Sequence, residues 1–264
     1  MSTDLVRYAA AAVSDVGSKR ASNEDAFGLS AEYGVYIVCD GMGGAAAGEI
    51  ASSMAVDEML RRLSARAEPE AEAAPLEDVI DEAIRAANEA IHSRAQSNLQ
   101  LSGMGTTLVG LVTEGRRVLV FNVGDSRCYL MRTLSPEQSG QEPSAPSQRK
   151  LVQISLDHSL VEEQVRMGRM THEEALHSNY RNVITRALGT QAEVEPDIFE
   201  LEAAPGDIFL LCSDGLSGEV SDEQIESMLA ADLPLDEHCV RLVDAANQAG
   251  GHDNITCLLV RVEG

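Results

Sequence analysis

The stretch TLVGLVTEGRRVLVFNV, residues 107–123, decides the fold. It holds two runs rich in Val and Leu, residues 107–112 and 118–123, on either side of Glu114, Gly115 and Arg116. Runs of this length and composition favour β-strands. A turn this short joins only antiparallel neighbours, because a parallel connection must cross the sheet and needs about a dozen residues or more. The stretch therefore predicts an antiparallel hairpin.

The rest of the chain supplies further short strands and paired helices. Strand-like runs occupy residues 35–39, 208–212 and 255–262. Apolar residues at helical spacing predict helices from about residue 47 to 63, from 76 to 91, over 160–167, and in two pieces within 221–248. Ser221 followed by Gln224 is a capping-box pattern at the start of one of them. Because the helices come in pairs and not after every strand, we expect an α+β layered sandwich and not a doubly wound parallel sheet.

Composition excludes several classes of function. The chain has 264 residues, with 20 Lys and Arg against 43 Asp and Glu, a net charge of −23. Such a charge disfavours binding to nucleic acid or to an anionic membrane surface. No run reaches the roughly 18 apolar residues of a membrane span, and residues 1–13 make a poor signal peptide. Five scattered cysteines without a CxxC pair fit free thiols. We expect one cytoplasmic domain over residues 1–264.

One polar segment interrupts this domain. Residues 132–149 are rich in Ser, Pro and Gln, and strand-like runs at 118–131 and 151–156 flank them. This composition is typical of a flexible loop. We therefore expect a long hairpin loop inside the domain and not a domain boundary.

Acidic residues follow the apolar runs. Asp40 with Gly41 ends one run, Asp214 and Asp125 follow two others, and Asp253 lies just before the last. In an antiparallel sheet the end of one strand lies beside the start of its neighbour, so the four carboxylates can gather at one edge. Their repulsion is costly unless cations neutralise it, and oxygen ligands without Cys or His favour Mg²⁺ or Mn²⁺. Any one Asp-Gly pair alone is also an ordinary turn.

A second cluster lies near the N-terminus. Arg20 is followed by the adjacent acids Glu24 and Asp25. One interpretation is a solvated loop. The other is a phosphate-binding arginine beside metal-binding acids, since the planar guanidinium can hold phosphate oxygens with two hydrogen bonds.

Together these motifs resemble those of the metal-dependent protein serine/threonine phosphatases, the protein phosphatase 2C family, of bacterial type. The motifs are RxxNED (20–25), DGMGG (40–44) with GE (48–49), GMGTT (103–107), GDSR (124–127), DHS (157–159), RNxxTRxLG (181–189), SDGL (213–216) and DNIT (253–256). Each is weak alone, but the ordered set is specific and covers nearly the whole chain. The resemblance implies a four-layer α-β-β-α sandwich, two antiparallel sheets flanked by helix pairs, and a mobile flap at about 168–180.

The resemblance also implies roles for residues of the metal centre. Asp40 would bridge two metals, Mn²⁺ or Mg²⁺, with the Gly41 carbonyl on one of them. Asp214 and Asp253 would hold the other metal. Arg20 would bind the substrate phosphate and share catalysis with Asp40.

The resemblance implies supporting roles for three further acids. Glu24 and Asp25 would support the metal pair directly or through water. Asp125, with Asp214, would form a third metal site.

A mechanism follows from these parts. In the scheme that the resemblance implies, two cations would lower the pKa of a bridging water, and the resulting hydroxide would attack phosphorus in line. The metals and Arg20 would neutralise charge on the phosphoryl oxygens. Because the hydroxide would attack directly, no covalent phosphoenzyme would be needed. The expected substrates are phosphoserine and phosphothreonine proteins, the products of an opposing Ser/Thr kinase. We expect a monomer that acts in signalling.

One residue departs from the pattern of many eukaryotic relatives, which carry His after the Asp-Gly. Here the residue is Met42, which cannot protonate the leaving alkoxide. His177, on the expected flap, is a candidate general acid or a plain surface residue. His252, beside Asp253, is expected to be a supporting or turn residue.

The sequence also allows four other interpretations. A non-catalytic phosphoprotein-binding scaffold would be expected to lack metal acids, which are all present here. The GxGxxA pattern over residues 41–46 also fits a dinucleotide-binding loop, but alternating βαβ units are missing. A serine hydrolase using Ser213 or Ser217 with His158 or His252 would lack a GxSxG elbow. Cys39 could be a redox switch, but strand alternation places its side chain opposite that of Asp40, which favours a core thiol.

Overall fold

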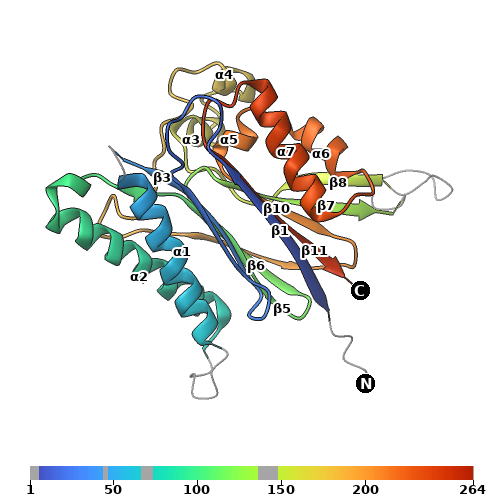
Figure 1. Ribbon diagram of the computed structural model, residues 1–264, viewed down its shortest axis with the longest axis horizontal. Coiled ribbons are helices and arrows are strands. Elements are labelled where there is room, and N and C mark those ends of the chain that lie inside the picture. The colour runs from blue at the N-terminus through green and yellow to red at the C-terminus, as the bar shows by residue number, and fades with distance from the viewer. Residues whose placement is uncertain (1–5, 44–46, 67–73, 136–147, 264) are drawn as a thin grey trace.

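The structure is a computed structural model that describes residues 6–43, 47–66, 74–135 and 148–263, except for the side chain of Leu176. Two antiparallel sheets form its centre (Figure 1). The first sheet has the strand order β1 (Arg7–Asp15), β11 (Ile255–Glu263), β10 (Ile208–Cys212), β7 (Arg127–Leu134) and β8 (Gln148–Gln153). The second has the order β2 (Asp25–Ser30), β3 (Val35–Met42), β5 (Leu108–Glu114), β6 (Arg117–Val123) and β9 (Asp197–Glu202), and the short β4 (Gly105–Thr106) pairs with β3.

The hairpin predicted from residues 107–123 is present as β5 and β6. Glu114 pairs with Arg117 at its end, and the register continues to Leu108 opposite Val123. Gly115 has a φ of 61° in the turn, a left-handed conformation that favours glycine. The local turn thus sets the antiparallel direction of the second sheet.

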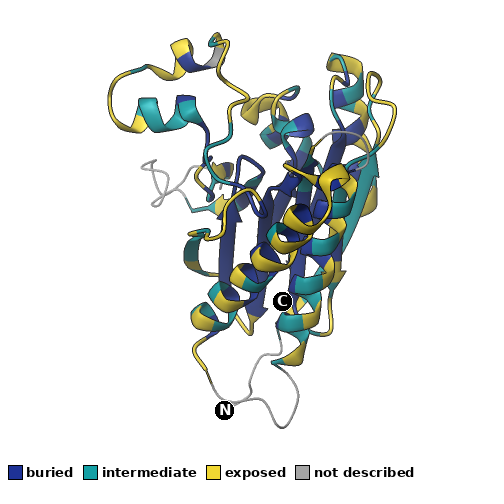
Figure 2. Ribbon diagram, turned by 90° about the vertical axis from the view of Figure 1, so that its left-hand side faces the viewer, coloured by how far each residue is buried: buried dark blue, intermediate teal, exposed yellow. Residues whose placement is uncertain are grey.

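Helices cover the outer face of each sheet, as Figures 1 and 2 show. The second sheet is covered by α1 (Ala47–Ala65) and α2 (Leu76–Ser97), and the first by α5 (Asp214–Ser217), α6 (Asp222–Leu229) and α7 (Leu235–Ala249). Shorter elements are η1 (Leu99–Leu101), α3 (Leu160–Arg166) and α4 (His172–Leu176). Ser221 caps α6 and Gln224 completes the capping box, as predicted.

Three apolar clusters fill the spaces between the four layers. One lies between α1, α2 and the second sheet, one between the two sheets, and one between the first sheet and α5–α7. The predicted four-layer α-β-β-α sandwich is therefore confirmed. Figure 2 shows the result, with buried strands inside and helices exposed on their outer faces.

Side-chain alternation along β3 determines which way the site faces. Val35, Ile37 and Cys39 belong to the cluster beneath α1 and α2, whereas Tyr36 and Val38 lie between the sheets. Cys39 is a fully buried free thiol, and burial raises its pKa, so the expectation of a core thiol is confirmed. Asp40, the next residue, follows the alternation of Tyr36 and Val38 toward the space between the sheets.

Some strands differ from the expectations. Residues 118–131 form two strands, β6 and β7, because the chain breaks at Gly124, whose φ is 111°. Strands β1, β2, β4 and β9 were not predicted. The strands flanking the polar segment pair antiparallel down to Leu134 opposite Gln148. Residues 136–147, most of the predicted flexible loop, lie outside the described residues.

Candidate active site

The acidic residues at the strand ends come together at one end of the two sheets. Asp25 and Asp40 are directly opposed in the β2–β3 register. Asp214 is the first residue of α5 after β10, and Asp125 lies between β6 and β7. The pKa of Asp40 is raised well above its usual value, first by burial and then by the charges of Asp25, Asp214, Asp125 and Asp253. The predicted gathering of carboxylates at one edge is thus observed.

Three of these carboxylates each have one buried oxygen without a hydrogen-bond partner among the described residues, namely the Oδ1 atoms of Asp25, Asp125 and Asp214. The other oxygen of Asp25 accepts a hydrogen bond of 2.7 Å from Ser213 Oγ. Burial raises the pKa of Asp25 to about 7, and burial with the nearby Asp214 raises that of Asp125 to about 7. Unpartnered buried oxygens of this kind are costly in a folded protein.

The donor chemistry of this site fits hard divalent cations. Every donor is a carboxylate or carbonyl oxygen, which suits Mg²⁺ or Mn²⁺. A cation would satisfy the unpartnered oxygens and offset their mutual repulsion. In the described part of the chain, no three His, Cys, Asp or Glu side chains are already arranged to hold a metal ion. The match between this site and a divalent cation therefore depends on the donor types and on the unpartnered oxygens.

The backbone around Asp40 is held by a small network. Asp40 donates its N–H to Thr107 Oγ1 at 2.9 Å, and its carbonyl accepts from the Thr107 N–H and from Thr106 Oγ1, both at 2.9 Å. Thr107 Oγ1 is also 2.7 Å from Ser126 Oγ, next to Asp125. Thr107 and Ser126 lie inside the GMGTT and GDSR motifs, but the sequence alone predicts no role for either side chain.

Close backbone approach explains the glycines near Asp40. The Gly41 N–H donates to the Glu24 carbonyl at 3.1 Å, and a Cβ on Gly41 would lie 2.2 Å from the Gly48 carbonyl oxygen. A Cβ on Gly48 would lie 2.4 Å from Glu24 Oε2. Burial also raises the pKa of Glu24, against the opposing effect of Arg20. Glu24 and Gly41 therefore lie together beside Asp40.

Arg20 lies at the rim of the cluster, on the loop between β1 and β2. Its Nη2 atom is 2.6 Å from Asp253 Oδ2, and the Arg20 side chain is 51% exposed. The other oxygen of Asp253 accepts from the Asn254 N–H at 2.8 Å. The structure thus joins the arginine from the N-terminal motif to the acid from the C-terminal motif, with the guanidinium open to solvent.

Ser213 and the two candidate histidines are arranged unlike the catalytic groups of a serine hydrolase. Ser213 is fully buried and donates to Asp25. His158 is buried, its Nε2 is 3.2 Å from Asp197 Oδ2, and burial lowers its pKa. His252 Nδ1 is 2.7 Å from Glu219 Oε1. Among the described residues, the hydrogen bonds of Ser213 Oγ go to Asp25, Asn254 and Thr256 and not to a histidine, whereas a serine hydrolase needs a serine–histidine hydrogen bond.

The dinucleotide-binding interpretation is also unsupported. Strand β3 is antiparallel to both neighbours, β2 and β5. A dinucleotide-binding loop needs a parallel βαβ unit. Residues 44–46 of the pattern lie outside the described residues.

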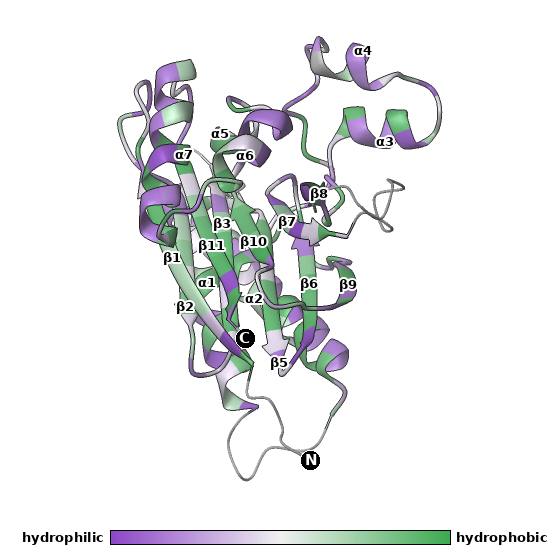
Figure 3. Cartoon of the chain, turned by 90° about the vertical axis from the view of Figure 1, so that its right-hand side faces the viewer, coloured by the Kyte–Doolittle hydropathy of each residue, from purple (hydrophilic) through white to green (hydrophobic). Residues whose placement is uncertain are grey.

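The segment carrying α3 and α4 projects from the end of the molecule where α5 lies (Figure 3). Thr171 caps α4, and Tyr180, which follows it, is 63% exposed. This segment includes residues 168–180, for which the mobile flap stays a prediction. His177 is exposed there.

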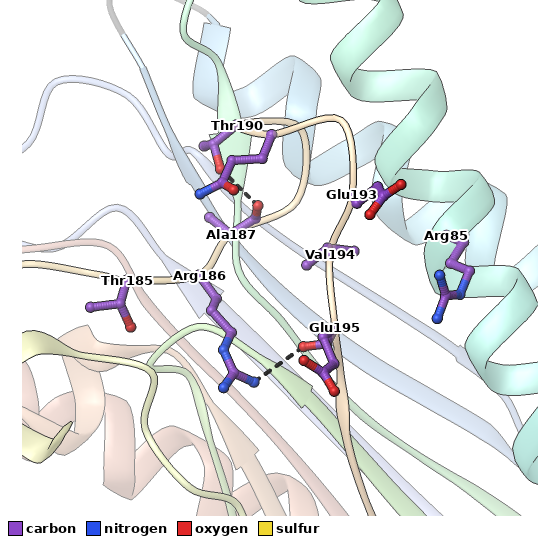
Figure 4. A pocket seen from close by; sticks show the side chains of 9 residues that line it. Arg85, Thr185, Arg186, Ala187, Thr190, Glu193, Val194 and Glu195 are labelled. Carbon is purple, nitrogen blue, oxygen red and sulfur yellow. Dashed lines mark hydrogen bonds between the residues drawn. The ribbon is translucent and has the colours of Figure 1, made fainter. Parts of the chain in front are cut away.

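A cavity of about 440 Å³ lies next to this region, between α2 and residues 185–195 (Figure 4). Its lining residues are Arg85, Thr185, Arg186, Ala187, Thr190, Gln191, Glu193, Val194 and Glu195. Arg186 Nη1 donates to the Glu195 carbonyl at 3.3 Å across it. The cavity contains none of the clustered carboxylates, so it is separate from the acidic site.

No helix in the described residues combines the length and apolar character needed to cross a membrane.

An acidic, all-oxygen site at the end of a four-layer sandwich fits an enzyme that depends on hard divalent cations. The family model for protein phosphatase 2C matches residues 17–259. The chain therefore belongs to the protein phosphatase 2C family, as the sequence motifs predicted.

Individual relatives agree with this assignment. The chain is 37% identical over 253 residues to the serine/threonine phosphatase stp of Listeria monocytogenes, covering 93% of this chain and 92% of that protein. The crystal structure of the Mycobacterium tuberculosis serine/threonine phosphatase PstP/Ppp matches with a TM-score of 0.83 and 38% identity, over 98% of this chain and 99% of that one. The PstP catalytic domain in complex with two manganese ions matches with a TM-score of 0.81 and 36% identity, over 98% of this chain and 100% of that one.

Proposed function

We propose that this chain is a protein phosphatase that hydrolyses phosphoserine and phosphothreonine with Mn²⁺ or Mg²⁺ bound among its clustered carboxylates. The observation that carries the proposal is the set of buried oxygens on Asp25, Asp125 and Asp214, around Asp40, that have no hydrogen-bond partner among the described residues. The phosphatase relatives, one of which binds two manganese ions, support catalysis over a scaffold role.

The chain offers oxygen donors for two core cations and a third. Asp40 and the Gly41 carbonyl, with Asp214 and Asp253, are the proposed ligands of the core pair. When bound, the cations supply electrophilic activation of the phosphate ester and of a water molecule. A water nucleophile needs no nucleophilic side chain, which agrees with the burial of all five cysteines.

Supporting acids complete the proposed centre. Asp125 is buried next to Asp214, which suits it to share a third cation with that residue. Glu24 and Asp25 lie within the same charged cluster and would support the core pair.

Arg20 is the proposed phosphate-binding residue. Its side chain is about half exposed and pairs with Asp253 at the rim, so a phosphate arriving from solvent meets a guanidinium already directed at the acidic cluster. Two parallel hydrogen bonds from the guanidinium would orient the phosphate for in-line attack. Met42 cannot protonate the leaving group, and the exposed His177 stays a candidate for that step.

The cellular setting is part of the same proposal. Five free, buried thiols support a reducing cytoplasmic location. Phosphoprotein substrates imply an opposing Ser/Thr kinase that produces them. The enzyme is proposed to act as a monomer, which light scattering of the purified protein checks.

Replacing the clustered acids tests the function. We expect Asp40→Asn and Asp214→Asn to lower Mn²⁺-dependent hydrolysis of para-nitrophenyl phosphate and of a phosphothreonine peptide at least a hundredfold, because charge stabilisation by a metal centre is worth several kcal/mol. Asp244→Asn is the matched control, since Asp244 is exposed on α7. Rates near wild type in either site variant would contradict the proposal.

A further inference from the structure

The loop that carries Arg20 has no strand of its own. It runs from the end of β1 at Asp15 to the start of β2 at Asp25, outside both sheets. The Arg20 side chain is half exposed and forms an ion pair with Asp253. The position of the Arg20 guanidinium at the rim therefore depends on the contacts that hold the backbone of this loop in place.

One buried side chain fastens the loop at three points. Asn254 is 4% exposed. Its Nδ2 amide donates to the carbonyls of Val16 and Ser22, both at 2.9 Å, and its Oδ1 accepts from the Glu24 N–H at 2.8 Å. These partners lie before and after Arg20, so a single amide ties the entrance of the loop to its exit. Both amide hydrogens of Asn254 are used, which requires an amide and not a carboxylate here.

The turn before β11 also contacts the loop directly. Ser18 and Lys19 both donate their N–H groups to the Gly251 carbonyl, at 2.8 and 3.1 Å. A Cβ on Gly17 would lie 2.1 Å from the Asp253 carbonyl oxygen, so the two segments are in close contact. The turn over residues 251–254 therefore supplies both the acid that pairs with Arg20 and the contacts that hold its loop.

We propose that Asn254 is the positioning residue for Arg20 and thereby sets the affinity of the enzyme for the phosphate group of its substrate. The inference rests on the proposed phosphate-binding role of Arg20. Without the Asn254 amide, the two carbonyls lose buried donors and the loop has one fewer connection between its ends. The guanidinium then samples several positions, and the conformational entropy lost when phosphate orders it weakens phosphate binding.

Inorganic phosphate is the probe that tests the proposal. In Asn254→Ser we expect the inhibition constant for phosphate and the KM for para-nitrophenyl phosphate to rise roughly tenfold, with a smaller change in kcat. The free energy lost with the buried hydrogen bonds of one amide corresponds to roughly a tenfold change in affinity. Asn254→Asp keeps the shape and the acceptor for Glu24 but removes the two donors. It is the second variant should Asn254→Ser fail to fold.

A second asparagine offers a matched control. Asn88, on α2 and 1% exposed, donates Nδ2 to the Gln191 and Ala192 carbonyls at 3.0 and 3.1 Å and accepts from the Gly189 N–H at 2.7 Å. It makes the same three bonds to a different loop. Asn88→Ser is expected to lower the Tm as Asn254→Ser does, while leaving the inhibition constant for phosphate unchanged.

Coupling to Arg20 separates positioning from a general structural role. In an Arg20→Ala background, Asn254→Ser should change phosphate affinity less than twofold, because the residue through which it acts is gone. A tenfold further loss in that background, or an unchanged phosphate affinity in the single variant, would overturn the inference.

Failure of the proposed function gives a different result. Wild-type protein without metal-dependent phosphatase activity would refute the enzyme assignment. Even then, calorimetry of phosphate binding to wild type and to the Asn254 variants would test whether Asn254 affects phosphate affinity.

Discussion

The buried carboxylates predict an unusual link between pH, metal and stability. Burial raises the pKa of Asp25 and of Asp125 to about 7 from an ordinary value of 3.8. Between these two pH values the native state without metal holds protons that the unfolded chain has released. Stability therefore falls as pH rises through this window and is lowest above pH 7.

The size of the effect follows from the pKa change. One pKa unit corresponds to ~1.36 kcal/mol, so a carboxyl that moves from 3.8 to about 7 costs on the order of 4 kcal/mol when it is forced to ionise. The two carboxyls share neighbours, so their total is less than twice that value. For a chain of this size, about 4 kcal/mol corresponds to a Tm change of roughly 10 °C.

Calorimetry at pH 5 and pH 8, with a chelator and then with Mn²⁺, measures both parts of the prediction. With the chelator, the Tm should be lower at pH 8. Mn²⁺ should raise the Tm more at pH 8 than at pH 5, because metal binding must displace the protons held at low pH.

Variants that lack one of the two titrating carboxyl groups are the controls for this prediction. Asp25→Asn and Asp125→Asn each remove one titrating group, so each should flatten the pH dependence of the chelated protein relative to wild type. Subtracting the variants removes the contribution of the other acids on this highly charged chain. A chelated wild-type Tm that is constant or rises from pH 5 to 8, or an equal Mn²⁺ shift at both pH values, would refute the reasoning.

Two further substitutions test the packing around the site. Gly41→Ala would place a Cβ 2.2 Å from the Gly48 carbonyl oxygen, so we expect about 1–3 kcal/mol of destabilisation and loss of Mn²⁺-dependent activity, and thermal unfolding with wild-type Tm would contradict this. Asp157→Asn would break the bidentate pair in which Arg127 donates to Asp157 at 2.7–3.1 Å. Because the partner guanidinium is largely buried, we expect urea unfolding to show a loss of about 3 kcal/mol, and a change below about 1 kcal/mol would count against the pair.

Local patterns predicted much of the architecture. The β5–β6 hairpin follows from a turn at Gly115, and the capped α6 follows from Ser221 and Gln224. Both depend on contacts between residues close in sequence. The family motifs extended this to the four-layer sandwich and to the identity of the acids.

Strands that depend on distant partners were missed. Strand β1 contains Ala9, Ala10, Ala11 and Ala12, and alanine has little intrinsic preference for strands. It is extended because all nine of its residues pair with β11, from Arg7 opposite Glu263 to Asp15 opposite Ile255. A partner about 250 residues away in sequence leaves no local signal.

The sequence by itself determined which donor types the site contains and that these acids lie at the ends of apolar strand segments. Asp40, Asp125 and Asp214 each follow an apolar run, and that placement is visible in the letters alone. Tertiary structure alone decided that these carboxylates share buried space, that one oxygen each of Asp25, Asp125 and Asp214 lacks a partner among the described residues, and that Asn254 holds the loop of Arg20. The physical reason is that burial and hydrogen bonding are properties of segments brought together from opposite ends of the chain, which no local pattern encodes.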